Sequence, residues 1–352
     1  MSRFFTESLR ALQPYVPGEQ PQDMQYIKLN TNESPFPPAP GVMAAISSAE
    51  VERLYLYSDP DCKALIGAIA KRFDLNPEQV TVGNGSDEVL WFALRAFCDE
   101  NTPLAYNDIT YGCYKTWCGL LNVPSKILPL RADYSIDLSL YNDLKATVMV
   151  TNPNAPTGIC LTPQQIEGIL KANPDNVVIV DEAYVDFGGR SCVGLIEKYD
   201  NLLVVQTCSK SRSLAGARLG FAMGNAGLIA DLDRIKFSFN PYNVNRLTCL
   251  AGIAAMEDEA YFYRCTKAVA DTRERTTEAL KQMGFTVTDS KANFLFAESS
   301  RIPGKALYLK LKERGILVRH FDKPRLENRL RITVGSDQQM DVLLTALRQL
   351  GA

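Results

Sequence analysis

A lysine that follows an apolar run is the first residue in this sequence whose type and position suggest chemistry. Leu202–Val205 contains only apolar side chains, which is typical of a buried strand, and Lys210 lies a few residues beyond it. A lysine in a partly desolvated pocket loses proton affinity, so its neutral amine can form a Schiff base with a carbonyl compound. We predict this role for Lys210; a solvated lysine in an ordinary turn is the alternative.

Hydroxyl groups and a cation lie close to this lysine in the sequence. Thr207 and Ser209 precede it, and Arg218 follows after a turn that contains glycine. Two hydroxyls and a guanidinium together suit a dianionic phosphate. A ligand that carries both a carbonyl and a phosphate would use the whole set, which indicates pyridoxal phosphate. The chain has a single histidine, His320, so lysine is the natural base.

Two further polar side chains stand where apolar runs end. Asp181 closes the run Val177–Val180, and a carboxylate there needs a cation or a donor in order to be buried. The protonated nitrogen of a pyridine ring would be such a partner, and its charge makes the ring an electron sink. Asn154 offers an amide donor from the loop Asn152–Gly158, which contains proline and glycine. A helix-capping aspartate and a purely structural turn are the alternatives.

The elements that must position these residues follow a βα pattern between about residues 62 and 240. Short apolar runs alternate with helical segments, which predicts a mostly parallel sheet with helices on both faces. Ligands of such sheets bind beyond the carboxyl ends of the strands. A glycine turn at 83–88 opens one helix, and free N–H groups at a helix start form an anion site. We expect strands at 79–82, 103–106, 125–129, 147–151, 177–181 and 202–207, and helices at 62–73, 111–121, 163–172 and 191–199, besides the one that reaches residue 97.

The pattern changes after about residue 244, where two long helical stretches precede short strands and further helices. We therefore expect an N-terminal arm at 1–40, a large domain at 41–243 and a small α+β domain at 244–352. The arm is rich in proline, which cannot continue a helix or a central strand. We expect the arm to lie over the molecular surface, with a partner subunit as one such surface; disorder is the alternative.

The composition excludes several classes of protein. The 352 residues are 46% hydrophobic and 22% charged, with a formal net charge of −2, so nucleic acid is not an expected partner. No run of about 18 apolar residues is present, and the N-terminus lacks an apolar signal core, so we expect neither a membrane span nor secretion. Nine cysteines without a C-x-x-C pair fit reduced thiols in a cytoplasm. One histidine excludes a multi-histidine metal site.

The order and spacing of these motifs resemble those of the fold-type I pyridoxal-phosphate-dependent aminotransferases, and within them the histidinol-phosphate aminotransferases. The resemblance covers essentially the whole chain, and it is carried by the segments 29–35, 83–88, 152–158, 180–184, 207–220 and 330–335. It implies an α/β fold whose large domain has a mostly parallel, seven-stranded sheet covered by helices. It also implies a smaller α+β C-terminal domain and a homodimer with shared active sites.

The resemblance implies a role for each site residue. Lys210 would be the Schiff-base lysine and proton carrier, and Asp181 would pair with the pyridine nitrogen. Asn154 and Tyr184 would hold the phenolic oxygen of the ring, and Tyr111 would stack on the ring. The phosphate would be held by Ser86, Asp87 through its backbone, Thr207, Ser209 and Arg218, and by Tyr57 from a partner subunit.

The substrate residues follow from the same resemblance. Arg331 would bind the α-carboxylate of glutamate, because a guanidinium matches the geometry of a carboxylate. The phosphate end of histidinol phosphate would be lined by Tyr15, Asn32, Arg319 and Arg331; for Arg319 a solvated strand end is the alternative. The chain departs from the family pattern at Ile109, Ser58, 211–213 and 239–244, which loosens the assignment of the substrate.

We therefore predict transamination between histidinol phosphate and 2-oxoglutarate, in histidine biosynthesis, through two half-reactions that share Lys210. A threonine-phosphate decarboxylase of cobalamin synthesis and an aromatic amino-acid aminotransferase are alternatives on the same scaffold. A ligand sensor that keeps the fold without catalysis is the alternative from another class of protein.

Overall fold

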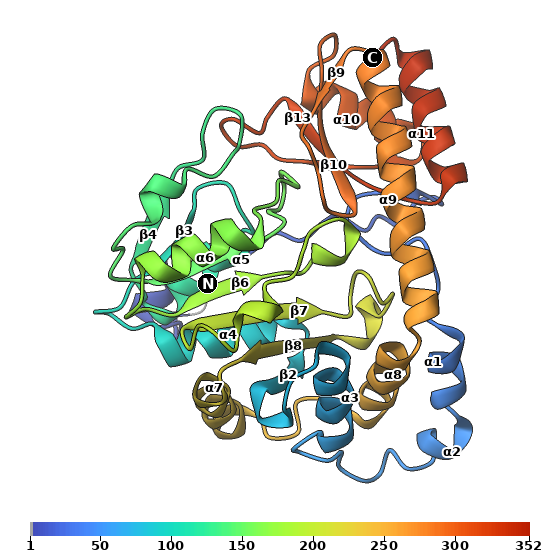
Figure 1. Ribbon diagram of the computed structural model, residues 1–352. Helices are drawn as coiled ribbons and strands as arrows, with labels where there is room; N and C mark the ends of the chain where they lie inside the picture. Colours follow the sequence, from blue (N-terminus) through green and yellow to red (C-terminus); the bar gives the residue numbers. More distant parts are fainter. Residues whose placement is uncertain (1–2) are drawn as a thin grey trace.

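The computed structural model describes residues 3–352 and has a seven-stranded sheet at the centre of its larger part (Figure 1). Its strands are β2 (Val80–Asn84), β3 (Leu104–Asn107), β4 (Ser125–Leu128), β5 (Thr147–Thr151), β6 (Val178–Asp181), β7 (Leu202–Thr207) and β8 (Leu219–Gly224). The strand order is β2-β8-β7-β6-β5-β3-β4, and β8 alone runs in the direction opposite to the other six strands. The start of β8 therefore lies at the same edge of the sheet as the carboxyl ends of the other strands.

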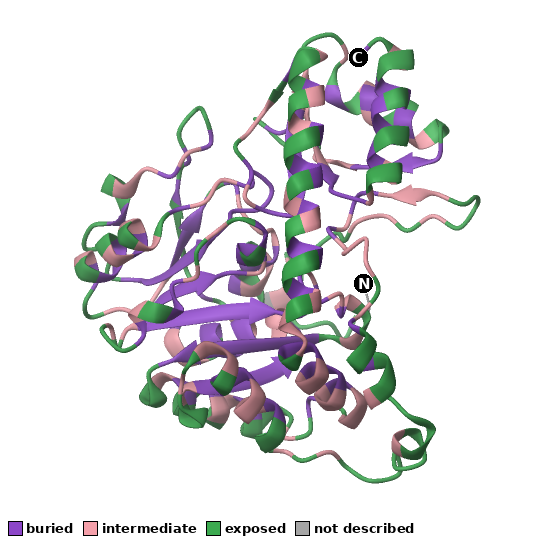
Figure 2. Cartoon of the chain, turned by 45° about the vertical axis from the view of Figure 1, so that its right-hand side comes forward, coloured by how far each residue is buried: buried purple, intermediate pink, exposed green. Residues whose placement is uncertain are grey.

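Helices cover both faces of this sheet. They are α3 (Lys63–Phe73), α4 (Ser86–Phe97), α5 (Cys113–Leu121), α6 (Pro163–Ala172), α7 (Ala226–Phe239) and α8 (Arg246–Glu257). Two short helices, α1 (Pro40–Ala45) and α2 (Ser48–Val51), pack against α8. The alternation of side chains along the strands separates two cores: Val148 and Val150 pack with α3, α6 and α8, whereas Met149 packs with α4, α5 and α7. Every residue of β5 to β8 is buried, and Figure 2 shows this burial concentrated in the sheet.

The smaller part of the molecule is built on a four-stranded antiparallel sheet of order β12-β13-β10-β9. Its elements are β9 (Phe285–Val287), β10 (Phe294–Ser299), β12 (Arg319–His320), β13 (Arg329–Thr333), α9 (Glu259–Gln282), α10 (Gly304–Glu313) and α11 (Asp337–Leu350). A separate pair joins the N-terminal segment to this part, because β1 (Ile27–Lys28) runs parallel to β11 (Ile316–Leu317). The long helix α9 extends from the large part into the small part (Figure 1).

The predicted fold class, α/β with a mostly parallel seven-stranded sheet and a smaller α+β part, is confirmed. Two segments differ from the expectation. The helix expected at 191–199 is only a 3₁₀ turn at Val193–Leu195, where Gly194 lowers helix propensity. Strand β8 was not among the predicted strands, because its glycines are more typical of turns. Other 3₁₀ turns lie at Glu7–Leu9, Pro77–Gln79, Leu138–Tyr141, Val185–Phe187 and Ala215–Ala217.

No helix within residues 3–352 combines the length and the apolar character that crossing a membrane requires.

Candidate active site

A pocket of about 220 Å³ lies at the edge of the sheet where β6 and β7 end and β8 begins. Thirteen of the fifteen residues that the sequence predicts for the site line this pocket. They are Tyr15, Asn32, Ser86, Asp87, Tyr111, Asp181, Tyr184, Thr207, Ser209, Lys210, Arg218, Arg319 and Arg331. The convergence follows from topology, because the parallel strands of one sheet bring their carboxyl ends to one edge.

Lys210 presents a partly buried amine to this pocket. Its Nζ donates a hydrogen bond to the carbonyl of Thr31 at 3.2 Å and lies 5.9 Å from the centroid of the Tyr184 ring. Burial lowers the pKa of Lys210 to about 8, and the positive charge of Arg331 acts in the same direction. The neutral, nucleophilic amine is therefore far more populated near neutral pH than it is in an exposed lysine.

Asp181 is a buried carboxylate held by neutral donors. Its Oδ2 accepts a hydrogen bond from the Tyr114 hydroxyl at 2.6 Å, and its Oδ1 accepts one from the Ala183 N–H at 3.2 Å. Burial raises the pKa of Asp181 to about 6, whereas these two hydrogen bonds act to lower it. No lysine or arginine of residues 3–352 forms an ion pair with this carboxylate. A cation in the pocket, such as a pyridinium, would supply the missing partner.

The start of α4 and the start of β8 approach each other closely because both carry glycine. A Cβ atom on Gly220 would overlap the backbone of Gly85 and Ser86, so only glycine allows this approach. Gly85 has φ +85°, and a Cβ there would lie 2.5 Å from Nη2 of Arg218. Arg218 itself has φ +56°, which turns its guanidinium over the start of α4. The result is a helix N-terminus with a cation above it.

Hydroxyl groups complete this set of donors around the start of α4 and Arg218, which forms a phosphate cup. The Thr207 and Ser209 hydroxyls lie 3.0 Å apart, and Arg218 Nη1 lies 3.4 Å from the Ser209 Oγ. The free N–H groups in the first turn of α4 add donors and a favourable helix dipole. Such a set of donors fits a phosphate group.

The Asp87 side chain contacts both Tyr111 and Arg218. Its carboxylate accepts a hydrogen bond from the Tyr111 hydroxyl at 3.0 Å and forms an ion pair with Arg218 at 3.3 Å. Burial raises the pKa of Tyr111, and the Asp87 charge acts in the same direction, so the Tyr111 hydroxyl stays protonated and donates. The Tyr111 ring is also fixed by edge contacts with Tyr15 at 5.7 Å and Tyr114 at 5.6 Å. The predicted stacking residue is therefore held in a fixed orientation.

Asn32 and Tyr184 form one hydrogen-bonded unit at the boundary with the small part. Asn32 Nδ2 donates to the Tyr184 hydroxyl at 3.0 Å, and the Thr333 hydroxyl donates to Asn32 Oδ1 at 3.1 Å. The Tyr184 ring packs edge-on against Phe294 at 5.0 Å. Both predicted residues are thus positioned from the small sheet.

The two predicted substrate arginines lie opposite each other on β12 and β13. Arg331 donates to the carbonyl of Asn30 at 2.9 Å, while its buried Nε has no hydrogen-bond partner among the described residues. A guanidinium that lines the pocket is suited to a carboxylate or phosphate oxygen. Arg319 instead donates to the carbonyls of Val16 and Pro17, at 2.9 and 3.1 Å. It thereby holds the N-terminal segment, with Tyr15, across the pocket of the same chain.

Two predicted residues do not line the pocket. Asn154 is buried, and its amide donates to the Ile109 carbonyl at 3.0 Å and to the Thr157 hydroxyl at 3.1 Å. Tyr57 is 79% exposed, and its ring stacks on Tyr242 with the centroids 4.4 Å apart. Within this chain Tyr57 therefore lies on the surface.

Sequence reasoning assigned no role to Tyr114, Thr151 and Thr110, which connect Asp181 to Asn154. The Tyr114 hydroxyl lies 2.8 Å from the Thr151 Oγ1, which lies 2.9 Å from the Thr110 Oγ1. Thr110 Oγ1 in turn donates to Asn154 Oδ1 at 2.8 Å. The only sequence signal for Tyr114 was its spacing from Tyr111, which places Tyr114 in the first turn of α5 and Tyr111 just before that helix.

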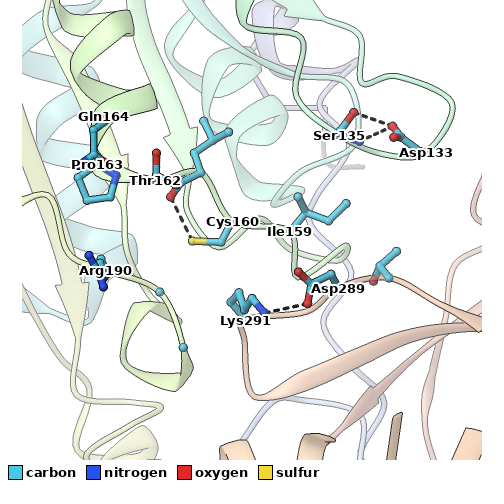
Figure 3. Close-up of a pocket in the computed structure, with 14 residues that line it drawn as sticks. Asp133, Ser135, Ile159, Cys160, Thr162, Pro163, Gln164, Arg190, Asp289 and Lys291 are labelled. Carbon is cyan, nitrogen blue, oxygen red and sulfur yellow. Dashed lines mark hydrogen bonds and ion pairs between the residues drawn. The ribbon is translucent and has the colours of Figure 1, made fainter. Parts of the chain in front are cut away.

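Two other cavities lie outside this pocket. An outer cleft of about 600 Å³ adjoins it and shares Tyr15, Tyr111, Arg319 and Arg331 with it, and Lys115 and Lys323 line its rim. A cavity of about 500 Å³ lies between the loops 159–164, 188–190 and 288–291 and contains none of the predicted site residues (Figure 3). Among residues 3–352, no group of three or more histidine, cysteine or acidic side chains is arranged to hold a metal ion.

The sequence profile of the family "Aminotransferase class I and II" matches residues 24–347. The chain belongs to this family. It is 52% identical to the histidinol-phosphate aminotransferase of Marinomonas sp. (strain MWYL1), over 99% of this chain and 100% of that protein. It is 51% identical to histidinol-phosphate aminotransferase 2 of Dechloromonas aromatica, over 99% of both chains.

A solved structure shares the fold. The histidinol-phosphate aminotransferase of Sinorhizobium meliloti, crystallised in complex with pyridoxal-5'-phosphate, superposes with a TM-score of 0.90. The superposition covers 100% of this chain and 98% of that chain, at 24% sequence identity. The likeness therefore extends over both parts of the molecule.

Proposed function

We propose that this protein uses pyridoxal phosphate to transfer the amino group of histidinol phosphate to 2-oxoglutarate, a step of histidine biosynthesis. One observation carries the proposal. A single pocket combines the Lys210 amine, whose pKa is lowered, the Asp181 carboxylate, which has no ion-pair partner, and a set of donors that fits a phosphate group. The names of the relatives at about half identity over the full chain support the same substrate.

Different residues of the pocket would bind different parts of the cofactor. Lys210 would hold the aldehyde of the cofactor, Asp181 its ring nitrogen, and the cup around Arg218 its phosphate. Tyr111 would stack on the ring, and Tyr184 would face its phenolic oxygen. We also propose that Asn154, whose amide donates to Ile109 and Thr157, acts on this oxygen after a change of hydrogen-bond partner.

When bound, pyridoxal phosphate supplies a carbonyl that condenses with amines and a pyridinium ring that withdraws electrons from the α-carbon of the substrate. Asp181 would keep the ring nitrogen of the bound cofactor protonated, since a buried carboxylate without another cation favours a proton on its partner. The Lys210 amine, whose pKa burial lowers to about 8, would be suited to taking the proton from the α-carbon of the substrate.

The charges around the outer cleft suit an anionic substrate. Arg331 lines both the pocket and the cleft, where its guanidinium would bind the carboxylate of glutamate or the phosphate of histidinol phosphate. Arg319, Lys115 and Lys323 add positive charge on the same cleft. The acidic residue of its lining, Asp108, is paired with Arg325 at 3.0 Å.

We propose a homodimer in which Tyr57, exposed in one chain, reaches the phosphate of the partner subunit. We also propose a cytoplasmic location, since all nine cysteines are free thiols.

The test is a pair of half-reactions followed by the absorbance of the bound cofactor. Histidinol phosphate alone is expected to change the absorbance, and 2-oxoglutarate is expected to reverse the change. Lys210→Ala is expected to abolish both, whereas Lys171→Ala, on the exposed side of α6, leaves them intact. Release of carbon dioxide from O-phosphothreonine would assign the decarboxylase instead, and a protein that takes up no cofactor would overturn the proposal.

A further inference from the structure

Two cysteines face each other where α3 packs against α8, away from the pocket. The Sγ atoms of Cys62 and Cys249 lie 3.8 Å apart. Among the described residues, no other two cysteine sulfurs lie within hydrogen-bond distance. Cys62 is buried and Cys249 is partly exposed, so small reagents reach the pair from the side of α8.

The surroundings of Cys62 favour its thiolate. Cys62 is the N-cap residue of the eleven-residue helix α3, whose dipole stabilises a negative charge there. The hydrogen bond with the Cys249 thiol and, to a smaller extent, the positive charge of Lys236 lower the pKa of Cys62, against the opposing effects of burial and of the charges of Asp59 and Asp61. The other eight cysteines, all within the described residues, have raised pKa values, chiefly through burial or, for Cys249, through Cys62 itself.

We propose that Cys62 and Cys249 form a redox modification site, which closes to a reversible disulfide when the protein meets hydrogen peroxide. The Cys62 thiolate attacks one peroxide oxygen, the O–O bond breaks, and a sulfenic acid and one water form. The Cys249 thiol then attacks the Cys62 sulfur, the S–O bond breaks, and a second water leaves. The two sulfurs lose two electrons in total, which reduce the peroxide, and a small dithiol reverses the process.

The geometry permits this bond with little movement. A disulfide needs its sulfurs about 2.05 Å apart, so they must approach by roughly 1.8 Å. Side-chain rotation together with a small shift of the Asp59–Cys62 turn can supply this distance. Both cysteines lie on elements that already pack together.

The bond would connect two segments that lead to the pocket. On one side, Cys62 closes the loop in which Ser58 donates to the Val244 carbonyl at 2.7 Å. On the other side, Thr248, which precedes Cys249, donates to the Ala217 carbonyl at 2.8 Å, beside Arg218. Any effect of the disulfide on the pocket rests on the proposed function, whereas the formation of the disulfide does not.

The test uses the purified full-length protein with its cofactor. Hydrogen peroxide treatment, alkylation of the remaining thiols under denaturing conditions, and tryptic digestion without reduction should yield residues 54–63 linked to 247–264. Dithiothreitol should abolish the linked pair. Cys98→Ser, a variant in another buried cysteine, should retain it, and Cys249→Ser should leave a Cys62 sulfenic acid that dimedone traps.

The proposal fails if the wild-type protein gives no linked pair under conditions that oxidise it, or if Cys62 pairs with a different cysteine. It also fails if Cys62 is alkylated to the same extent with and without peroxide. None of these readouts depends on activity, so they remain informative even if the enzyme transfers no amino group.

Discussion

At the scale of single residues, Asp181 depends on a side chain that does not line the pocket. Tyr114 is fully buried and donates the 2.6 Å hydrogen bond that acts to lower the pKa of Asp181. Hydrogen bonds to charged groups contribute about 1.5–3 kcal/mol. Tyr114→Phe is therefore expected to lower kcat by about tenfold. It should also move the acid limb of the pH–rate profile to higher pH, because Asp181 then accepts a proton more readily.

Tyr141→Phe is the matched control for this variant. Tyr141 is equally buried, and its hydroxyl donates to Asn107 at 2.8 Å, outside the pocket. This variant should lose stability while it keeps the acid limb in place. Equal shifts in the two variants would show that Tyr114 acts only through stability.

The pKa of Lys210 predicts how fast the cofactor-free protein takes up pyridoxal phosphate. Only the neutral amine reacts, and burial lowers the pKa of Lys210 to about 8. The uptake rate should rise with pH, roughly tenfold per unit well below pH 8, and level off above it. Rapid-mixing absorbance measurements between pH 6 and 10 check this profile. A rate that still rises steeply at pH 10 would place the amine in an environment like water.

At the scale of elements, the contact between α4 and β8 forms the phosphate cup. Gly220→Ala places a Cβ against the backbone of Gly85 and Ser86, neither of which can yield as a flexible side chain would. We expect the start of β8 to move away from α4, with a stability loss of about 1–3 kcal/mol. Cofactor affinity, measured by titration of the cofactor-free protein, should fall by tenfold or more.

Gly216→Ala provides the comparison for this element. Gly216 lies in the turn before Arg218, and a Cβ there would meet no atom within 4 Å. It should leave both stability and affinity close to those of the wild type. If Gly220→Ala binds the cofactor as tightly as Gly216→Ala, the cup does not depend on this close approach.

At the scale of the whole molecule, residues of the small part form hydrogen bonds with the Asn154 loop. The Thr288 hydroxyl donates to the Thr157 carbonyl at 2.6 Å, and the Lys291 N–H donates to the Gly158 carbonyl at 2.8 Å. Helix α8 shares the core of the large part, with Ala251 and Ala255 among its members. We therefore propose that the small part begins within α9.

The proposed dimer predicts that two inactive variants restore each other. In a hybrid of Tyr57→Ala and Lys210→Ala subunits, one of the two sites combines a native Lys210 with the partner's native Tyr57. Random pairing gives roughly a quarter of the wild-type activity, because half of the dimers are hybrids with one native site each. The measurement is the activity after the two variants are mixed, unfolded and refolded together. Activity no greater than that of the unmixed variants would place Tyr57 outside the partner's site.

Much of the fold could be predicted because its signals are local. Strands β5 and β7 and helix α6 have the bounds that apolar runs and caps indicate. Strand β8 could not be predicted in this way, since its Gly220 is required by a contact with the start of α4 and not by the backbone of the strand itself. The position of Tyr57 on the surface and the engaged amide of Asn154 likewise depend on partners distant in sequence.

The sequence by itself determined which chemical groups stand at successive strand ends, and the parallel order of those strands made their convergence foreseeable. Lys210, Asp181 and the phosphate-binding residues belong to this part. Only the tertiary structure decided what holds them: Tyr114 on Asp181, Gly85 and Gly220 under the cup, and the N-terminal segment across its own pocket. The physical reason is that these contacts join residues far apart in the chain, and such pairs leave no periodic pattern in the sequence.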